Sequence, residues 1–323
     1  MFHITNGEQA NAWLQGAGIA GEYLAWDDVL HEGPVPAGLS LHDLSLIRAR
    51  FISFCGWATE FEAQTHFQTR DARFLEAARN KSVVIWNSHE LFDQLHMLQV
   101  LSWYCQQGAQ LPPPRIVFVD ALLGAGELDN AALEQALIEA QPATTEQLAC
   151  ADQLWQLFSA GNPRGLAAAA AEPVPEFPYM QQALERLLAE YPDEQGLSLT
   201  ERRILEAVAA GHDDPVAMFR AVRDAEAVPF MGDASFWLIV QGLCSTDQPL
   251  LTSVQGVGFI LPDLFAPDAA FREQRLQLTN CAQMLLAGEG NWLDTHMIDR
   301  WVGGVHLNPE NRWLYSGAGF RRY

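Results

Sequence analysis

The chain has 323 residues, of which 49% are hydrophobic and 10% are aromatic. This length favours about two domains, and so much apolar side-chain volume excludes a globally disordered protein. The formal net charge is −21. Because a field of that sign repels phosphate backbones, we do not expect a nucleic-acid partner.

The chain carries no feature of a secreted or membrane protein. It has no charge-free apolar run of about 18 residues, and Met1 to Asn6 lacks the basic and apolar stretches of a signal peptide. The cysteines are far apart and form no C-x-x-C pair, which argues against a disulfide framework or a thiolate zinc site. We therefore expect a cytoplasmic protein with no membrane partner and with reduced, buried thiols.

In the N-terminal part, predicted strands alternate with predicted helices. The strands are expected at 2–5, 22–26, 82–86 and 115–119, and the helices at 8–15, within 41–80 and from Leu91 onward. This alternation predicts an α/β domain over residues 1–125, with a parallel-type sheet and flanking helices. Ligands of such sheets bind beyond the carboxyl ends of the strands. We therefore expect the turns at Asn6, 27–32, 89–93 and Asp120 along one rim.

The remainder of the chain is predicted to be mainly helical. Residues 126–178 are expected to form a helical connector and linker, which would make 179–323 a separate domain. In that domain Ser198 and Glu201 form a capping box that opens a helix. Further helices are expected at about 215–224 and 233–243, and a strand at 249–252. This order predicts a winged-helix-like domain with an aromatic strand at its C-terminal end.

The first candidate site is the segment Trp26-Asp27-Asp28-Val29-Leu30-His31-Glu32-Gly33-Pro34. Its carboxylates and imidazole could hold a divalent metal or supply groups for acid–base catalysis. We assign catalytic roles to Asp27, His31 and Glu32 and a ligand-binding role to Asp28. The alternative is a solvated loop whose aspartates cap a turn.

The second candidate is His89-Glu90-Leu91-Phe92-Asp93-Gln94. It differs from the H-E-x-x-H of zinc hydrolases because aspartate replaces the second histidine, so a metalloprotease is not favoured. One interpretation is structural: Asn87 caps the helix and Glu90 closes a capping box. The other is a polar site that faces the first loop. In that site His89 is catalytic, and Glu90, Asp93, Gln94 and Asn6 bind the ligand.

Two further segments are relevant to DNA binding, protein contact and ligand binding. The helix at 233–244 would be the DNA-reading helix of a winged helix, yet it contains no basic residue, so it is expected to be buried or to contact a protein. In the tail, Gly303 and Gly304 beside aromatic residues predict a closely packed, bulged strand. The alternative for the tail is a ligand cleft that uses Arg300 and His306.

These motifs resemble a bacterial family catalogued as domain of unknown function 1835. The similar segments are Asn6-Gly7, Gly21-Glu22 with Trp26-Asp27, Leu30 to Pro34, and His89 to Leu95. Pro229 to Asp233 and Asp299 to His306 look like the companion domain that often follows this family's domain. Residues 125–195 are the least similar. The resemblance implies the division into two domains and implies no particular activity.

The leading hypothesis is a small-molecule or metal-dependent site in the N-terminal domain. His31 or His89 would be the acid–base group, and the carboxylates would orient it or hold the metal. Whether the site is that of an enzyme is left open. The alternative is a regulatory or adaptor protein that binds a protein partner through exposed apolar surface on the helix at 233–244. A DNA-binding regulator is the least favoured function.

Overall fold

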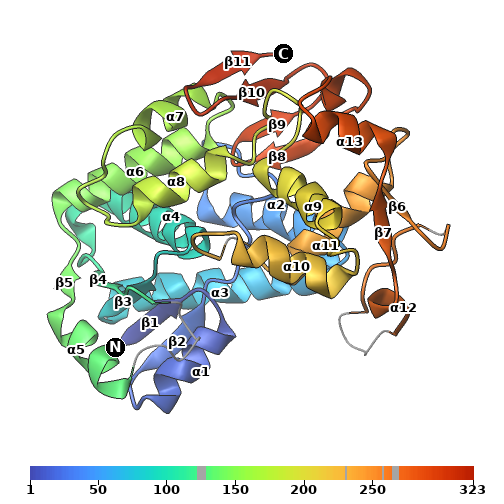
Figure 1. Cartoon of the computed structure of the whole chain (residues 1–323). Coiled ribbons are helices and arrows are strands. Elements are labelled where there is room, and N and C mark those ends of the chain that lie inside the picture. Colours follow the sequence, from blue (N-terminus) through green and yellow to red (C-terminus); the bar gives the residue numbers. More distant parts are fainter. Residues whose placement is uncertain (122–128, 230, 257, 264–268) are drawn as a thin grey trace. The chain divides into compact units, whose positions relative to one another are not determined.

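The computed structural model describes residues 1–121, 129–229, 231–256, 258–263 and 269–323 (Figure 1). These residues form two compact units. The first consists of Met1–Leu187 with Arg300–His306, and the second of Leu188–Asp299 with Leu307–Tyr323. The predicted boundary at residues 125 and 126, and Phe230 of the companion-domain segment, lie outside the described residues. No helix within the described ranges has the length and apolar content that crossing a membrane requires.

The first unit is built on a mostly parallel five-stranded sheet in the order β2-β1-β3-β4-β5, as the predicted α/β class requires. The parallel strands are β1 (Phe2–Thr5), β2 (Glu22–Ala25), β3 (Val83–Asn87) and β4 (Arg115–Phe118). The short β5 (Gln141–Pro142) runs antiparallel to β4. Every residue of β1 and β3 is buried, which is typical of parallel strands covered on both faces.

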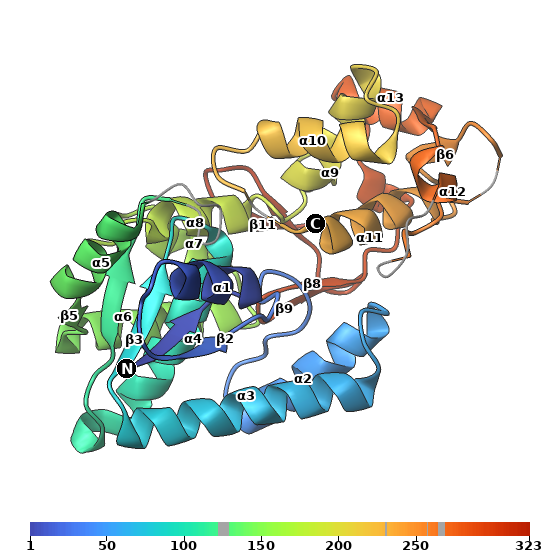
Figure 2. The same cartoon turned by 90° about the horizontal axis from the view of Figure 1, so that it is seen from below.

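The helices of this unit agree with the predicted order. They are α1 (Glu8–Gly16), α2 (Leu41–Phe54), α3 (Glu60–Asn80), α4 (Leu91–Gln107), α5 (Asn130–Glu139), α6 (Thr145–Ser159) and α7 (Arg164–Ala170), with a 3-10 turn at Gly108–Gln110. The helical stretch 41–80 is two helices that lie side by side (Figure 2). They are separated where Gly56 takes a positive φ of 75° and Thr59 forms a capping box that begins α3.

The expected connector belongs to the first unit. Its helix α6 packs along α4, and the Ser102 hydroxyl donates to Asp152 Oδ1 over 2.7 Å between them. The later part of this stretch, which was expected to be the linker, contains α7, in which Leu166 and Ala170 are buried. The chain passes to the second unit only within α8 (Met180–Leu188). This stretch is therefore packed structure and not a spacer, because Leu166 and the alanines after it form a helix with a buried face.

The second unit is mainly helical and ends in small antiparallel hairpins. Its elements are α9 (Leu199–Ala209), α10 (Pro215–Asp224), α11 (Asp233–Cys244), β6 (Leu251–Ser253), α12 (Ala269–Arg272), β7 (Leu276–Leu278), α13 (Asn280–Leu286), a 3-10 turn (Trp292–Asp294), β10 (Trp313–Tyr315) and β11 (Phe320–Arg322). Strand β6 pairs antiparallel with β7, and β10 with β11. The predicted capping box of Ser198 and Glu201 opens α9.

A hairpin near the C-terminus completes the first unit. It consists of β8 (Arg300–Val302) and β9 (Val305–Leu307), joined by Gly303 and Gly304. Gly304 N donates to Phe158 O over 2.9 Å, and Gly303 O accepts from Val35 N over 2.9 Å. A Cβ on Gly304 would lie 1.7 Å from the carbonyl oxygen of Ser159. The close packing predicted for the two glycines is confirmed, although they turn a hairpin and do not form a bulge.

Gly304→Ala is expected to lower the free energy of unfolding by about 2–3 kcal/mol, because the added methyl group overlaps the end of α6. Urea unfolding followed by circular dichroism measures the loss. Gly16→Ala is the control, since a Cβ on Gly16 meets no atom within 4 Å. Equal stability of the two variants would contradict the close packing of the hairpin.

Candidate functional site

The structure distributes the predicted site residues over three places in the first unit. Asn6, His89, Glu90, Asp93 and Gln94 lie at the carboxyl ends of β1 and β3. Asp27, Asp28, His31 and Glu32 lie in the loop after β2, and Arg300 and His306 lie on the hairpin of β8 and β9.

The first place lies where the order of the sheet reverses. From β1 the chain forms β2 on one side, and it then returns to form β3 on the other side of β1. Such a reversal leaves a crevice at the carboxyl ends, which is the usual ligand position in this architecture. Here Asn6 Nδ2 donates to Glu90 Oε2 over 3.4 Å, and the Ser88 hydroxyl lies 3.5 Å from the same oxygen. The sheet therefore brings together residues from the ends of β1 and β3.

Asp93 is the buried carboxylate of this place. Its side chain lies in the first turn of α4 and is only 2% exposed. Oδ2 accepts a hydrogen bond of 2.9 Å from Ser88 N, whereas Oδ1 has no hydrogen-bond partner among the described residues. Burial raises the pKa of Asp93 to about 6, and the contacts with Ser88, the Asn6 amide and the charge of His89 oppose that rise.

The turn between β3 and α4 corrects the predicted capping. Helix α4 begins at Leu91, and Glu90 occupies the N-cap position without a side-chain cap. Asn87 ends β3, and its amide donates to Asp93 O over 3.0 Å, so neither predicted cap exists. Gln94 donates to Ser88 O over 2.6 Å and also to the Asn87 side chain, which makes it a residue that shapes the turn. His89 precedes the helix and therefore does not share a helical face with Asp93.

His89 is the partly exposed imidazole of the strand ends. Its Nδ1 lies 3.3 Å from Oδ1 of Asp120, which stands two residues beyond the end of β4. The His89 side chain is 21% exposed and that of Asp120 is 87% exposed. The ring of Tyr179 packs edge-on against the imidazole, with 6.0 Å between ring centroids. A histidine beside a carboxylate in this manner has the geometry of an acid–base group.

The second of these places is the loop after β2, which the buried side chain of Asp28 stabilises. The Arg48 guanidinium on α2 donates from Nε to both Asp28 oxygens over 2.9 and 3.1 Å. It also donates to the carbonyl oxygens of Glu32 over 2.7 Å and Val29 over 3.0 Å. Both charged side chains are buried. The shape of this loop therefore comes from the buried ion pair. Asp28 has a structural role, but as the buried partner of Arg48 and not as the turn cap of a solvated loop.

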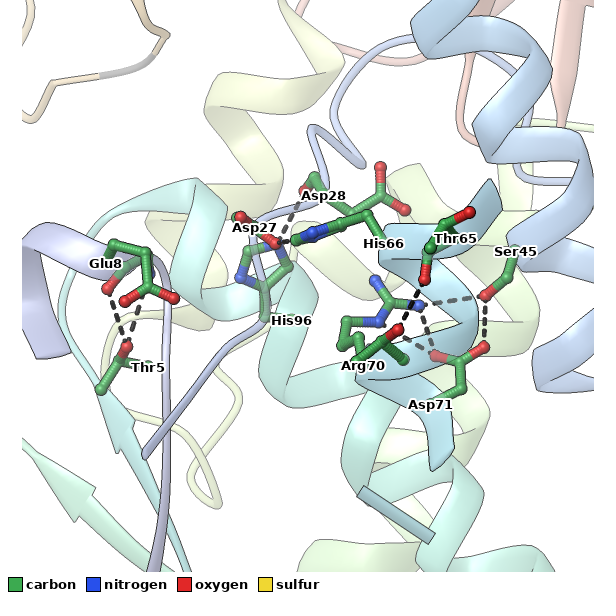
Figure 3. A network of polar contacts seen from close by, with 12 residues as sticks. Thr5, Glu8, Asp27, Asp28, Ser45, Thr65, His66, Arg70, Asp71 and His96 are labelled. Atoms are coloured by element: carbon green, nitrogen blue, oxygen red, sulfur yellow. Dashed lines mark hydrogen bonds and ion pairs between the residues drawn. The ribbon is translucent and has the colours of Figure 1, made fainter. Parts of the chain in front are cut away.

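The remaining residues of the loop differ in exposure. His31 is buried beside the ring of Phe92, at 5.8 Å between centroids, and its Nε2 lies 3.8 Å from Glu32 Oε1. Asp27 faces outward and forms an ion pair of 2.8 Å with Nε2 of His66 on α3 (Figure 3). Of the two histidines predicted as acid–base groups, His89 is the more exposed, and His66 is a third imidazole that the predicted set lacked.

Asp27 and His66 favour each other's charged form. Burial raises the pKa of Asp27, but the hydrogen bond and charge of His66, together with the charge of Arg70 and a backbone hydrogen bond, leave the pKa below its ordinary value. The hydrogen bond from Asp27 raises the pKa of His66, with opposition from burial and from the charge of Arg70. The charge of Glu8, at the start of α1, also favours protonated His66.

The third place is a stacked pair of rings. His306 and Trp301 lie parallel on the hairpin, with centroids 4.5 Å apart and planes inclined by 1°. This contact joins β8 to β9, so at least part of the role of His306 is to hold the hairpin together.

Metal binding was one expectation for the acidic segments. Within the described parts of the chain, no group of three or more histidine, cysteine, aspartate or glutamate side chains could hold a metal ion. All five cysteines are free, as predicted, but they are half-buried and not fully buried as expected.

Several polar residues of these sites were absent from the predicted set. The rule that ligands bind at strand ends placed Asp120 on the rim without a role, and it could also have included Ser88, which directly follows β3. His66 and Tyr179 have no such signal, because one lies within a long helix and the other in a proline-rich segment.

Comparison of the chain with protein-family models and with curated proteins finds no match.

Asp28→Ala is expected to lower the free energy of unfolding by about 3–5 kcal/mol, because it leaves the Arg48 guanidinium buried without its carboxylate. Chemical unfolding measures the change. Arg50→Ala is the control: Arg50 pairs with Glu60 at the surface, where such pairs contribute less than about 1 kcal/mol. A similar small loss in both variants would show that the buried pair does not hold the loop.

Asp93→Asn is expected to raise Tm at pH 7.5 by roughly 2–5 °C and to change it little at pH 4. The pKa of Asp93 is raised from 3.8 in the unfolded chain to about 6 in the folded protein. Folding therefore favours the protonated form, and the carboxylate destabilises the fold as pH rises through this interval. Asparagine removes that charge and can still accept from Ser88 N. Calorimetry at the two pH values makes the measurement, with the exposed Asp120→Asn as control; a lower Tm at pH 7.5 would refute the argument.

Proposed function

We propose that the first unit binds a small polar molecule at the carboxyl ends of β1, β3 and β4. We call this place the strand-end site and define it by Asn6, Ser88, His89, Glu90, Asp93 and Asp120. The observation that carries the proposal is the buried Asp93 carboxylate, whose Oδ1 has no hydrogen-bond partner among the described residues at the reversal of the sheet. A buried acceptor of this kind is costly unless a ligand or water satisfies it.

The residues of the strand-end site restrict the ligand by charge. Three of the six are carboxylates and none is lysine or arginine, so the site favours a molecule with amine or hydroxyl groups and disfavours a phosphate. Asn6 and Ser88 add hydrogen-bonding groups that fix orientation. For a ligand that is chemically transformed, His89 is the acid–base group, and Asp120 orients its ring.

We also propose membership of the family named domain of unknown function 1835. It is supported by the positions of the similar segments, since Asn6-Gly7, Trp26-Asp27 and His89 to Leu95 each follow a parallel strand. For the second unit we propose a winged-helix-like arrangement, supported by three helices, α9 to α11, followed by the antiparallel β6 and β7. A cytoplasmic location is supported by the five free cysteines.

The adaptor alternative depended on exposed apolar surface along α11. Phe236, Trp237 and Val240 of this helix are instead buried in the core of the second unit, and the Trp237 ring packs against Phe271 at 4.9 Å. The helix therefore offers little apolar surface for a partner, and the strand-end site remains the better supported function.

A thermal-shift screen of small amines, polyols and phosphate esters tests the proposal. A ligand at about 100 times its Kd stabilises by about 2.7 kcal/mol, which gives a rise in Tm of several degrees. We expect amines or polyols to raise Tm of the full chain and phosphate esters not to do so. Asn6→Ala and Glu90→Gln should abolish the shift, whereas the exposed His42→Gln should retain it. Equal shifts in all variants, or no shift with any compound, would reject the site.

A further inference from the structure

The buried carboxylates of the first unit differ in whether they have a cationic partner. Among its described residues, the carboxylates that are buried are those of Asp28, Asp71 and Asp93. Arg48 Nη2 lies 2.8 Å from Asp28 Oδ1, and Arg70 Nη2 lies 2.8 Å from Asp71 Oδ1 (Figure 3). For Asp93 there is no lysine or arginine partner in the described part of the chain. Asp93 is therefore the exception among the three.

The carboxylate of Asp93 lies within the strand-end site. Ser88 contacts both acids of the turn: its backbone nitrogen donates to Asp93 Oδ2 over 2.9 Å, and its hydroxyl lies 3.5 Å from Glu90 Oε2. Glu90 Oε2 in turn accepts from Asn6 Nδ2 over 3.4 Å. Oδ2 of Asp93 is therefore occupied, and Oδ1 has no hydrogen-bond partner among the described residues. Because a carboxylate oxygen can only accept, a group that satisfies Oδ1 must donate.

The charge of Asp93 decides which donor fits. Burial raises the pKa of Asp93 to about 6, so the carboxylate is ionised at pH 7.5. A buried charge is costly without a counter-charge. His89 is the basic group of this turn, but its Nδ1 already lies 3.3 Å from a carboxylate oxygen of Asp120. A hydroxyl would satisfy the hydrogen-bonding capacity of Oδ1 and leave the charge unbalanced, whereas a cationic donor satisfies both.

The geometry of the carboxylate also selects among cations. A guanidinium binds best to both oxygens at once, and Ser88 N already occupies Oδ2. A quaternary ammonium has no N–H to donate. The ammonium of a primary amine is compact and can donate to a single oxygen of a residue that is only 2% exposed. It reaches this oxygen when the half-buried His89 or Glu90 side chain rotates outward.

We propose that the ligand of the strand-end site is a primary amine whose ammonium group donates to Oδ1 of Asp93. The ammonium supplies the positive charge that arginine side chains supply to the other two buried aspartates. This inference rests on the proposed function, and it narrows the ligand from an amine or polyol to an amine. The ammonium nitrogen should lie about 2.8 Å from Oδ1.

Thermal shifts of the full chain at pH 7.5 with matched compounds test the need for a cation. 4-Aminobutan-1-ol and butane-1,4-diol differ only in an ammonium group in place of a hydroxyl. Tetramethylammonium has the same charge without an N–H, so it controls for general screening of a chain with net charge −21. At equal concentrations we expect the amino alcohol to raise Tm and the other two compounds not to do so.

The outcomes of this screen separate the inference from the proposed function. Equal shifts with the amino alcohol and the diol, lost in Asn6→Ala, would overturn the need for a cation and leave the strand-end site in place. Equal shifts with tetramethylammonium would show that screening is the cause and would also overturn the inference. No shift with any of the compounds would reject both.

Asp93→Asn tests the contact itself. It should weaken the apparent affinity for 4-aminobutan-1-ol by roughly 10- to 100-fold, the usual loss for a charge-assisted hydrogen bond. The matched control is Glu134→Gln on α5, which neutralises an exposed carboxylate of the same unit and should leave the affinity unchanged. Unchanged affinity in Asp93→Asn would overturn the inference.

Carbon NMR of the Asp93 carboxyl in the unsubstituted chain provides a readout that does not depend on the folding of a variant. A bound ammonium favours the carboxylate, so saturation with 4-aminobutan-1-ol should lower the pKa of Asp93 below its value in the free protein. His89, Glu90 and Asp120 also titrate in this region, so the Asp93 resonance must be assigned through its own bonds. An unchanged or raised pKa of Asp93 would contradict the contact.

Discussion

The structure of the first unit depends on the parallel pairing of β1 with both β2 and β3. Parallel pairing places the carboxyl ends of the strands at one edge, so each following turn begins from that edge. Residues as distant in sequence as Asn6 and Glu90 meet there because their strands are neighbours.

At this edge, some buried polar side chains stabilise a loop and others can bind a ligand. The two groups differ in whether all their polar atoms are paired within the protein. Asp28 and Arg48 are both buried, and Arg48 uses its donors on Asp28 and on carbonyl groups of the same loop. Such a pair fixes the backbone and has nothing left for a ligand. Asp93 is similarly buried, but its Oδ1 has no hydrogen-bond partner within the described ranges of the chain. A fold that keeps a partly unpaired carboxylate loses stability, and such losses are characteristic of sites retained for function.

Features that depend on residues close together in the sequence could be predicted from it, whereas contacts between distant residues could not. Strands and helices of the first unit follow from hydrophobic periodicity, and the capping box at Ser198 follows from a local motif. The rule for parallel sheets correctly brought Asn6 and Glu90 together. By contrast, the partners of Asp27 and Asp28 come from α3 and α2, and no local pattern marks His66 or Arg48 for those roles. The capping of α4 was mistaken because the chain stays extended through Asn87, so the helix begins later than the polar run suggested.

The two units are not two continuous stretches of the chain, because residues 300–306 belong to the first unit. The polypeptide therefore leaves the first unit after Leu187, returns at Arg300 and departs again after His306. During synthesis, Val35 and Phe158 emerge from the ribosome long before the glycines that bond to them. The N-terminal unit consequently cannot acquire its full set of contacts until nearly the whole chain has been translated, and its final packing is a late event in biogenesis.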